Sequence, residues 1–178
     1  PIEEAQKMIE AELERPLTSI FQDFSAPVAA ASIAQVHRAK LAADGADVAV
    51  KVLRPGIERA FRKDIDAFYF AARMVEILAP GARRLRPLDV IAHFEGVVLG
   101  ELDLRLESSA AGEFAANTES DEGFQLPQIN WSLSGKNVMT MDWAEGISAG
   151  DNAALDAAGH DRRRIGERIL QLFLSHAL

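Results

Sequence analysis

The chain has 178 residues, with 19 lysine and arginine residues against 27 aspartate and glutamate residues, so its formal net charge at pH 7 is −8. Because it contains no cysteine, the sequence excludes disulfide frameworks, thiolate metal sites and cysteine nucleophiles. The 48% share of apolar residues is enough for a buried core, and the acidic balance argues against a general nucleic-acid binder.

The first third of the chain predicts one helix followed by three short strands. Apolar residues recur at helical spacing over residues 2–13, and a proline ends this helix. Short segments rich in Ala, Val and Ser predict three antiparallel strands over residues 21–53, with an Asp-Gly turn between the second and third. Valines alternate with other residues along the third strand, which places Lys51 on the face opposite to the valines.

Two long helices follow in the sequence. Pro55 begins the first helix, at a position where its missing N–H costs little, and Pro80-Gly81 ends it. Pro87 begins the second helix, which we expect to continue to about Ala116. The arginines between the two helices indicate a solvated basic loop.

The last third predicts two strands and a final helix. Residues 124–131 and 137–143 have the composition of strands and are joined by a Ser-Gly-Lys turn. Residues 162–178 show an amphipathic pattern with a helical period. The fold class is therefore α+β, and no apolar run approaches the roughly 20 residues of a transmembrane helix.

Residues 29–36, Ala-Ala-Ala-Ser-Ile-Ala-Gln-Val, precede Lys51 by fifteen residues. In protein kinases a G-x-G-x-x-G-x-V hairpin covers the phosphates of ATP, and the lysine of a following V-A-I-K strand binds the α- and β-phosphates. Here alanines occupy the three glycine positions, so the cover should be stiffer. Either element alone also fits a tightly packed strand or an edge lysine, but the two together favour a nucleotide-binding hairpin.

Residues 101–107, Glu-Leu-Asp-Leu-Arg-Leu-Glu, supply carboxylates that could pair with this lysine. On a single continuous helix, Asp103 and Glu107 are four residues apart and should share a face. Carboxylates on one stretch could also hold a divalent cation. The alternative is an exposed acidic face in which Glu101 pairs with Arg105.

These motifs resemble those of the UbiB family of atypical kinase-like proteins, which are associated with ubiquinone biosynthesis. Residues 27–39 resemble the Ala-rich loop of that family, and residues 48–57 resemble its lysine strand. Residues 101–103 resemble its E-x-D motif, with Glu107 at the position of a later family glutamate. The resemblance runs from about Glu4 to the C-terminus.

The resemblance implies a truncated protein-kinase-like fold. Residues 1–143 would be an N-lobe with an antiparallel sheet and inserted long helices, and residues 144–178 would be the hinge and the start of the C-lobe. ATP is the implied ligand, together with Mg²⁺ in the complete protein.

The resemblance also implies roles for individual residues. Lys51 would bind the nucleotide phosphates and pair with Glu107, and these two are the expected catalytic residues. Glu101 and Asp103 would form a regulatory acidic motif that faces a K-x-G-Q motif absent from this chain. The expected ATP-binding residues are Ala29, Ala30, Ala31, Ser32, Ile33, Ala34, Val36, Lys51, Asp142, Trp143 and Ala144.

The sequence lacks an H-x-D loop and has no Asp-Phe-Gly segment, which in kinases supply the catalytic and Mg²⁺-binding aspartates. In the family these follow a helix like residues 162–178. We therefore expect a fragment that ends before them, inactive alone, from a longer atypical kinase or ATPase that supports ubiquinone biosynthesis. The alternative is a nucleotide-regulated, pseudokinase-like scaffold that organises quinone-biosynthesis proteins.

The other expectations concern partners and location. A lipid or quinone precursor is a further implied ligand, and no nucleic-acid partner is expected. The expected location is the cytoplasm or the periphery of a bacterial cytoplasmic membrane, with an organelle left open, and parts outside this chain would provide any membrane association. The four histidines lack metal-ligand spacing, no metal site is expected within these residues, and His37 reads as a partly buried strand residue.

Overall fold

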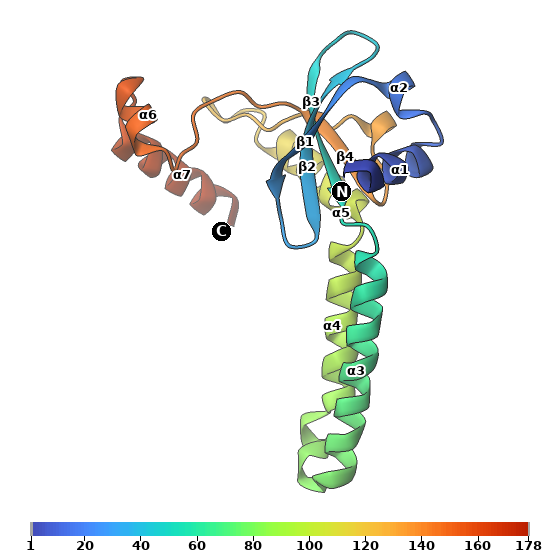
Figure 1. Cartoon of the computed structure of the whole chain (residues 1–178). Helices are drawn as coiled ribbons and strands as arrows, with labels where there is room; N and C mark the ends of the chain where they lie inside the picture. The colour runs from blue at the N-terminus through green and yellow to red at the C-terminus, as the bar shows by residue number, and fades with distance from the viewer. Residues whose placement is uncertain (1, 178) are drawn as a thin grey trace. The chain divides into compact units, whose positions relative to one another are not determined.

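The structure is a computed structural model that describes residues 2–177 (Figure 1). Its contacts divide the chain into two compact units, Pro1–Trp143 and Ala144–Leu178. The predicted α+β class is confirmed, since helices accompany one four-stranded antiparallel sheet. The assignment of the two units to the lobes of a kinase stays a prediction.

The strands lie in the sheet in their sequence order, and the three predicted over residues 21–53 are present. The register places Ala29, Val36, Lys51 and Met139 in one row across the sheet, so their side chains share a face. The strands are β1 (Phe21–Ala30), β2 (Ala34–Leu41), β3 (Asp47–Leu53) and β4 (Val138–Asp142).

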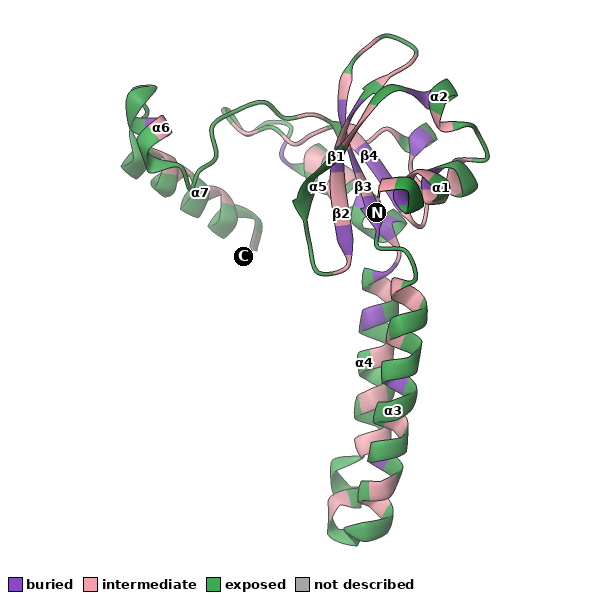
Figure 2. Cartoon of the chain, in the orientation of Figure 1, coloured by how far each residue is buried: buried purple, intermediate pink, exposed green. Residues whose placement is uncertain are grey.

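The side chains of β3 divide between two hydrophobic cores. Its three valines are buried in the first core, which α1 (Ile2–Leu13) covers through Ala5 and Ile9. Figure 2 shows buried residues concentrated in the sheet. The second core lies on the face of Lys51 and contains Ala34, Leu53, Ile65, Val98, Leu102, Leu104 and Met139.

The remaining elements are helical, and α3 and α4 lie side by side along their length (Figure 1). The basic loop expected between them is a short 3₁₀ helix with exposed arginines. Among residues 2–177 no helix is both long and apolar enough to cross a bilayer. The elements are α2 (Leu17–Ile20), α3 (Ile57–Leu78), η1 (Pro80–Leu85), α4 (Pro87–Glu101), α5 (Leu104–Asn117), η2 (Trp131–Leu133), α6 (Asn152–Ala157) and α7 (Arg162–Ala177).

The single helix predicted from Pro87 to about Ala116 is wrong, because the chain forms two helices, α4 and α5. Asp103 leaves the helical conformation, with φ −125° and ψ 95°, and its carboxylate accepts a hydrogen bond from the N–H of Arg105. Aspartate is a preferred N-cap residue because its carboxylate satisfies a free N–H of the first turn. The local capping preference therefore overrides the apolar periodicity.

The strand predicted over residues 124–131 is also wrong. Only an isolated bridge joins Ile129 to Met141 of β4, together with single bonds such as that from the Asn130 N–H to the Thr140 carbonyl, at 2.8 Å. Pro127 has no N–H to donate to a ladder, so this segment lies beside β4 without forming a strand.

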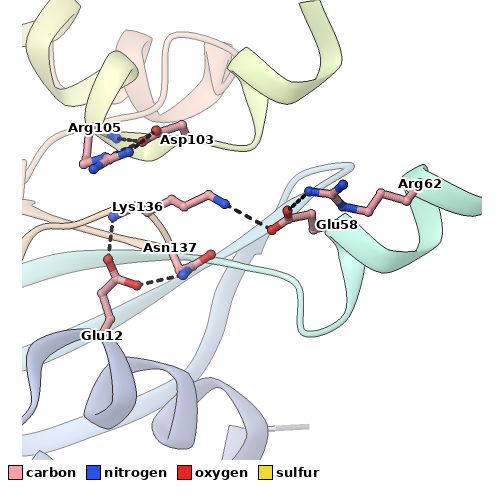
Figure 3. Close-up of polar contacts among 7 residues, drawn as sticks. All are labelled: Glu12, Glu58, Arg62, Asp103, Arg105, Lys136 and Asn137. Atoms are coloured by element: carbon pink, nitrogen blue, oxygen red, sulfur yellow. Dashed lines mark hydrogen bonds and ion pairs between the residues drawn. The ribbon is translucent and has the colours of Figure 1, made fainter. Parts of the chain in front are cut away.

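The turn before β4 is held by a glutamate of α1. The Glu12 carboxylate accepts from the N–H of Lys136 at 2.5 Å and from the Asn137 side-chain amide at 2.7 Å (Figure 3). The Nζ of Lys136 donates to Glu58 at 3.1 Å, and the Lys136 carbonyl accepts from the N–H of Leu104 at 2.9 Å. Residues of α1, α3 and α5 therefore meet at this one turn.

His37 lies on strand β2, as predicted, but it is fully buried instead of partly buried. Its ring stacks on Phe24 at 4.5 Å between centroids, and Nδ1 donates to the Ser25 carbonyl at 2.8 Å. Nε2 is buried and has no partner among the described residues. Burial lowers the pKa of His37, so the ring stays neutral at pH 7.

Replacing Gly135 by alanine should lower the free energy of unfolding by about 1–3 kcal/mol. A Cβ at this position would overlap the Glu12 carboxylate and push it away from its two donors, leaving them unpaired. The matched control is Gly96→Ala in α4, where a Cβ meets open space and helix propensity should add about 0.5–1 kcal/mol. Urea unfolding checks both, and a Gly135→Ala protein as stable as the wild type would contradict this role of Glu12.

The free energy of unfolding should decrease as the pH falls from about 7.5 to about 5.5. The unfolded His37 takes up a proton near pH 6.5 and the folded one only at lower pH, so in this range the unfolded state binds more protons. The stabilisation is complete above the unfolded pKa and is lost as the pH falls through the folded pKa. Urea unfolding across this range measures it. In His37→Gln the free energy of unfolding should depend less steeply on pH. An equally steep dependence in that variant would show that other groups cause it.

Candidate functional site

Lys51 and Glu107 form an ion pair between the sheet and a helix. The Nζ of Lys51 donates to both carboxylate oxygens of Glu107, each at 2.6 Å. Lys51 lies in β3 on the face opposite to the buried valines, and Glu107 lies in the first turn of α5. The side chains are 20% and 48% exposed, respectively, so solvent reaches the pair. The structure thus contains the contact that the family resemblance implies.

The Ala-rich segment, residues 29–36, forms the end of β1, a tight turn and the start of β2. The N–H of Ala31 donates to the carbonyl of Ala34 at 2.9 Å and closes the turn. No residue of the segment has a positive φ, so alanine fits every position where kinases use glycine. Val36 lies directly opposite Lys51, and residues 29–32 are exposed. The small residues of the segment and the lysine therefore share one part of the sheet.

The backbone donors at the end of β4 are used inside the first unit. The N–H of Asp142 donates to the carbonyl of Gln128 at 3.0 Å, and that of Trp143 donates to the carbonyl of Asp47 at 3.2 Å. Ala144 is the first residue of the second unit. Two of the three N–H groups in the expected adenine-binding segment are thus already hydrogen-bonded.

Trp143 is also fixed through its ring. The Arg38 guanidinium lies over the indole, 4.7 Å from its centroid, and its Nε donates to Asp47 at 3.0 Å. Asp47 also accepts from the Nζ of Lys40 at 2.8 Å. Hydrogen bonds from Arg38 and Lys40 lower the pKa of Asp47. This surface network fixes Trp143, the residue that follows β4.

The two residues of the expected acidic motif lie in different local structures. Glu101 is the exposed last residue of α4, whereas Asp103 caps α5 and accepts from the Arg105 guanidinium at 2.9 and 2.5 Å. The hydrogen bond from Arg105 lowers the pKa of Asp103. The expectation that Asp103 and Glu107 share one helix face is wrong, because Asp103 precedes the helix. The alternative pairing of Glu101 with Arg105 is also wrong, since Arg105 bonds Asp103.

No group of three His, Asp or Glu side chains within residues 2–177 lies close enough together to hold a metal ion. A hollow of about 530 Å³ lies elsewhere along α5, and none of the predicted site residues lines it. Its lining comes from two segments and comprises Ser109, Ala111, Gly112, Glu113, Ala115, Ala116, Glu119, Pro127, Gln128, Ile129 and Trp131.

Three residues with a part in the fold or the site were not predicted from the sequence, namely Glu12, Lys136 and Arg54. The contact between Glu12 and Lys136 joins positions 124 residues apart, and no periodicity or motif signals it. Arg54 donates from its side chain to the Ala31 carbonyl at 2.9 Å. Its place within the lysine-strand motif was the one available signal.

Comparisons with known proteins show the family of the chain. The model of the ABC1 atypical kinase-like domain family matches residues 1–178. A "Probable protein kinase UbiB" of Vibrio cholerae is 39% identical over 173 residues, which cover 97% of this chain and 32% of that protein. Proteins of the same name from Marinobacter nauticus and Shewanella baltica are 37% identical over 176 residues and 38% identical over 172 residues. These cover 98% and 96% of this chain, but 32% and 31% of the relatives, so the chain spans about a third of their length.

Substitution of Asp103 by alanine should lower the free energy of unfolding by about 1 kcal/mol, because α5 loses its N-cap. Asp103→Asn should retain most of the stability, since asparagine caps as well as aspartate does. Thermal or urea unfolding of the two variants measures the difference. An Asp103→Ala protein with wild-type stability would show that the cap does not hold α5.

Proposed function

Since the chain belongs to the ABC1 atypical kinase-like family, we propose that it is the ATP-binding part of an atypical kinase or ATPase. The observation that carries the proposal is the ion pair of Lys51 with Glu107, beside the Ala-rich segment. In protein kinases a lysine on the sheet and a glutamate on a helix must be paired before a phosphoryl group is transferred. Lys51 and Glu107 are the catalytic residues of this proposal.

The geometry of the pair suits an ammonium that binds phosphate. A lysine ammonium has three N–H donors, and Glu107 accepts from Nζ through both of its oxygens. A third donor remains for a phosphate oxygen, and the positive charge attracts the triphosphate. Because Glu107 already holds Nζ, the side chain of Lys51 loses little further conformational freedom when the nucleotide binds.

The Ala-rich segment is the proposed cover of the phosphates. Its exposed alanines carry small side chains, which permit a close approach of the backbone to an anion. The residues proposed to contribute are Ala29, Ala30, Ala31, Ser32, Ile33, Ala34 and Val36.

Asp142, Trp143 and Ala144 form the proposed adenine-binding segment. Since the N–H groups of Asp142 and Trp143 are bonded within the first unit, the adenine would use the backbone carbonyls of this segment and the N–H of Ala144. Residues 1–143 would then form the N-lobe, and residues 144–178 would begin the C-lobe.

ATP, when bound, supplies the phosphoryl group for transfer or hydrolysis. The described residues offer no group of three metal ligands, and we assign Mg²⁺ binding to parts of the protein outside this chain. Relatives of about three times this length leave room for such parts.

The proposed pathway is ubiquinone biosynthesis, supported by the name of the UbiB relatives. The phosphoryl acceptor would be water, a lipid or a quinone precursor, and other quinone-biosynthesis proteins would be partners at or near a membrane. Glu101 and Asp103 would form the regulatory acidic motif. Because Asp103 is bonded to Arg105, the exposed Glu101 is the more accessible of the two.

In the full-length protein, Lys51→Ala should raise the Kd for ATP at least about tenfold, because a charged hydrogen bond to phosphate is worth roughly 1.5–3 kcal/mol. Glu107→Gln should weaken binding less, since it leaves the ammonium in place. Isothermal titration calorimetry measures both, with Lys63→Ala, an exposed lysine on α3, as the matched control. Unchanged affinity in Lys51→Ala would overturn the proposal.

An ATP hydrolysis assay on the same full-length protein separates the two functional classes. Turnover that Lys51→Ala abolishes would support a kinase or ATPase. Binding of ATP without turnover of ATP or transfer of phosphate would support the nucleotide-regulated scaffold.

A further inference from the structure

Arg54 lies three residues after Lys51 and holds the Ala-rich turn. Its backbone N–H donates to the carbonyl of Ile33 at 2.8 Å, and its guanidinium Nη2 donates to the carbonyl of Ala31 at 2.9 Å. Its own carbonyl accepts from the N–H of Ile57, the first residue of α3, at 3.0 Å. One residue therefore connects the turn, the lysine strand and the start of α3.

These hydrogen bonds hold the turn at a place that the ladder between the strands does not reach. The last paired residues of β2 and β3 are Ala34 and Leu53, so the exposed turn lies past the end of the ladder. Hairpin ends of this kind fray unless something holds them. Apart from the internal bond of Ala31 to Ala34, the backbone and side chain of Arg54 provide the hold.

The same bonds determine which polar groups of the turn are left free. The described residues contain no cis peptide bond, and in a trans peptide the C=O and the N–H point in opposite directions. Because the carbonyl of Ala31 faces the Arg54 guanidinium, the N–H of Ser32 faces away from it. Neither the N–H of Ser32 nor that of Ile33 donates to another group within residues 2–177.

Within the turn, the carbonyls of Ala31 and Ile33 are therefore occupied, and the N–H groups of Ser32 and Ile33 are unpaired. Free backbone N–H groups of a turn form anion-binding concavities, whereas a free carbonyl oxygen would repel a phosphate. We propose that Arg54 is a positioning residue for the nucleotide phosphates. By binding the carbonyl of Ala31, its guanidinium turns the N–H of Ser32 away from itself. This N–H and the unpaired N–H of Ile33 are then available to phosphate oxygens. This inference rests on the proposed function, in which the turn covers the phosphates.

The test compares ATP with adenosine, which has the same base but no phosphates. Calorimetry on the full-length protein should show that Arg54→Ala raises the Kd for ATP about 3- to 10-fold, as expected for the loss of one hydrogen bond. The Kd for adenosine should not change. Arg54→Lys should recover part of the ATP affinity, and Arg59→Ala, an exposed arginine on α3, should change neither constant.

Hydrogen–deuterium exchange without nucleotide provides a second readout. Amides of residues 29–36 should exchange faster in Arg54→Ala than in the wild type, while those of β3 stay protected. If Arg54→Ala does not fold, Arg54→Lys carries the test, and the same changes of smaller size are then expected.

The possible outcomes separate this inference from the proposed function. Equal losses of affinity for ATP and adenosine would make Arg54 a merely structural residue and overturn the inference. Unchanged ATP affinity in Arg54→Ala, with weakened binding in Lys51→Ala, would overturn the inference alone. Unchanged affinity in both variants would overturn the proposed function and the inference with it.

Discussion

The contact between Lys51 and Glu107 depends on how firmly α5 is held against the sheet. A carboxylate 2.6 Å from an ammonium on another element stays there only if both backbones are fixed. The strand is fixed by the sheet itself. The helix is fixed at its first turn, where Leu104 is buried in the second core and its N–H donates to the carbonyl of Lys136. Asp103 caps the same turn, so the position of Glu107 follows from contacts within a few residues of it.

Strand β3 combines a structural and a functional face. Its valines lie in the core under α1, and this burial holds the strand without any help from Lys51. The lysine is thereby free to use its ammonium for an ion pair and, in the proposed function, for phosphate. Arg54, at the end of the same strand, extends this arrangement to the Ala-rich turn. Strand β3 is therefore the common support of Lys51, of the Ala-rich turn and, through the ion pair with Glu107, of α5.

Predictions from the sequence were correct where interactions between neighbouring residues decide the structure, and wrong where another interaction competes with the local pattern. The three strands over residues 21–53 were predictable because alternation and an Asp-Gly turn act locally, and the Lys51 motif was recognisable because its residue types are specific. The continuous helix through residues 101–107 was not correct, because the cap of Asp103 competes with a periodicity that looks unbroken. Residues 124–131 have strand composition, but Pro127 has no N–H to donate, and only an isolated bridge joins this segment to β4.

The sequence by itself determined the fold class, the three strands from residue 21 to residue 53 and the residue types of the candidate site. These follow from hydrophobic period, turn chemistry and motif spacing, all of which act over a few neighbouring residues. The tertiary structure alone decided which carbonyls Arg54 occupies and how Glu12 holds Lys136. Such contacts join residues 23 to 124 positions apart through single side-chain hydrogen bonds. A hydrogen bond of this kind leaves no period in the sequence, because its partners become neighbours only when the chain has folded.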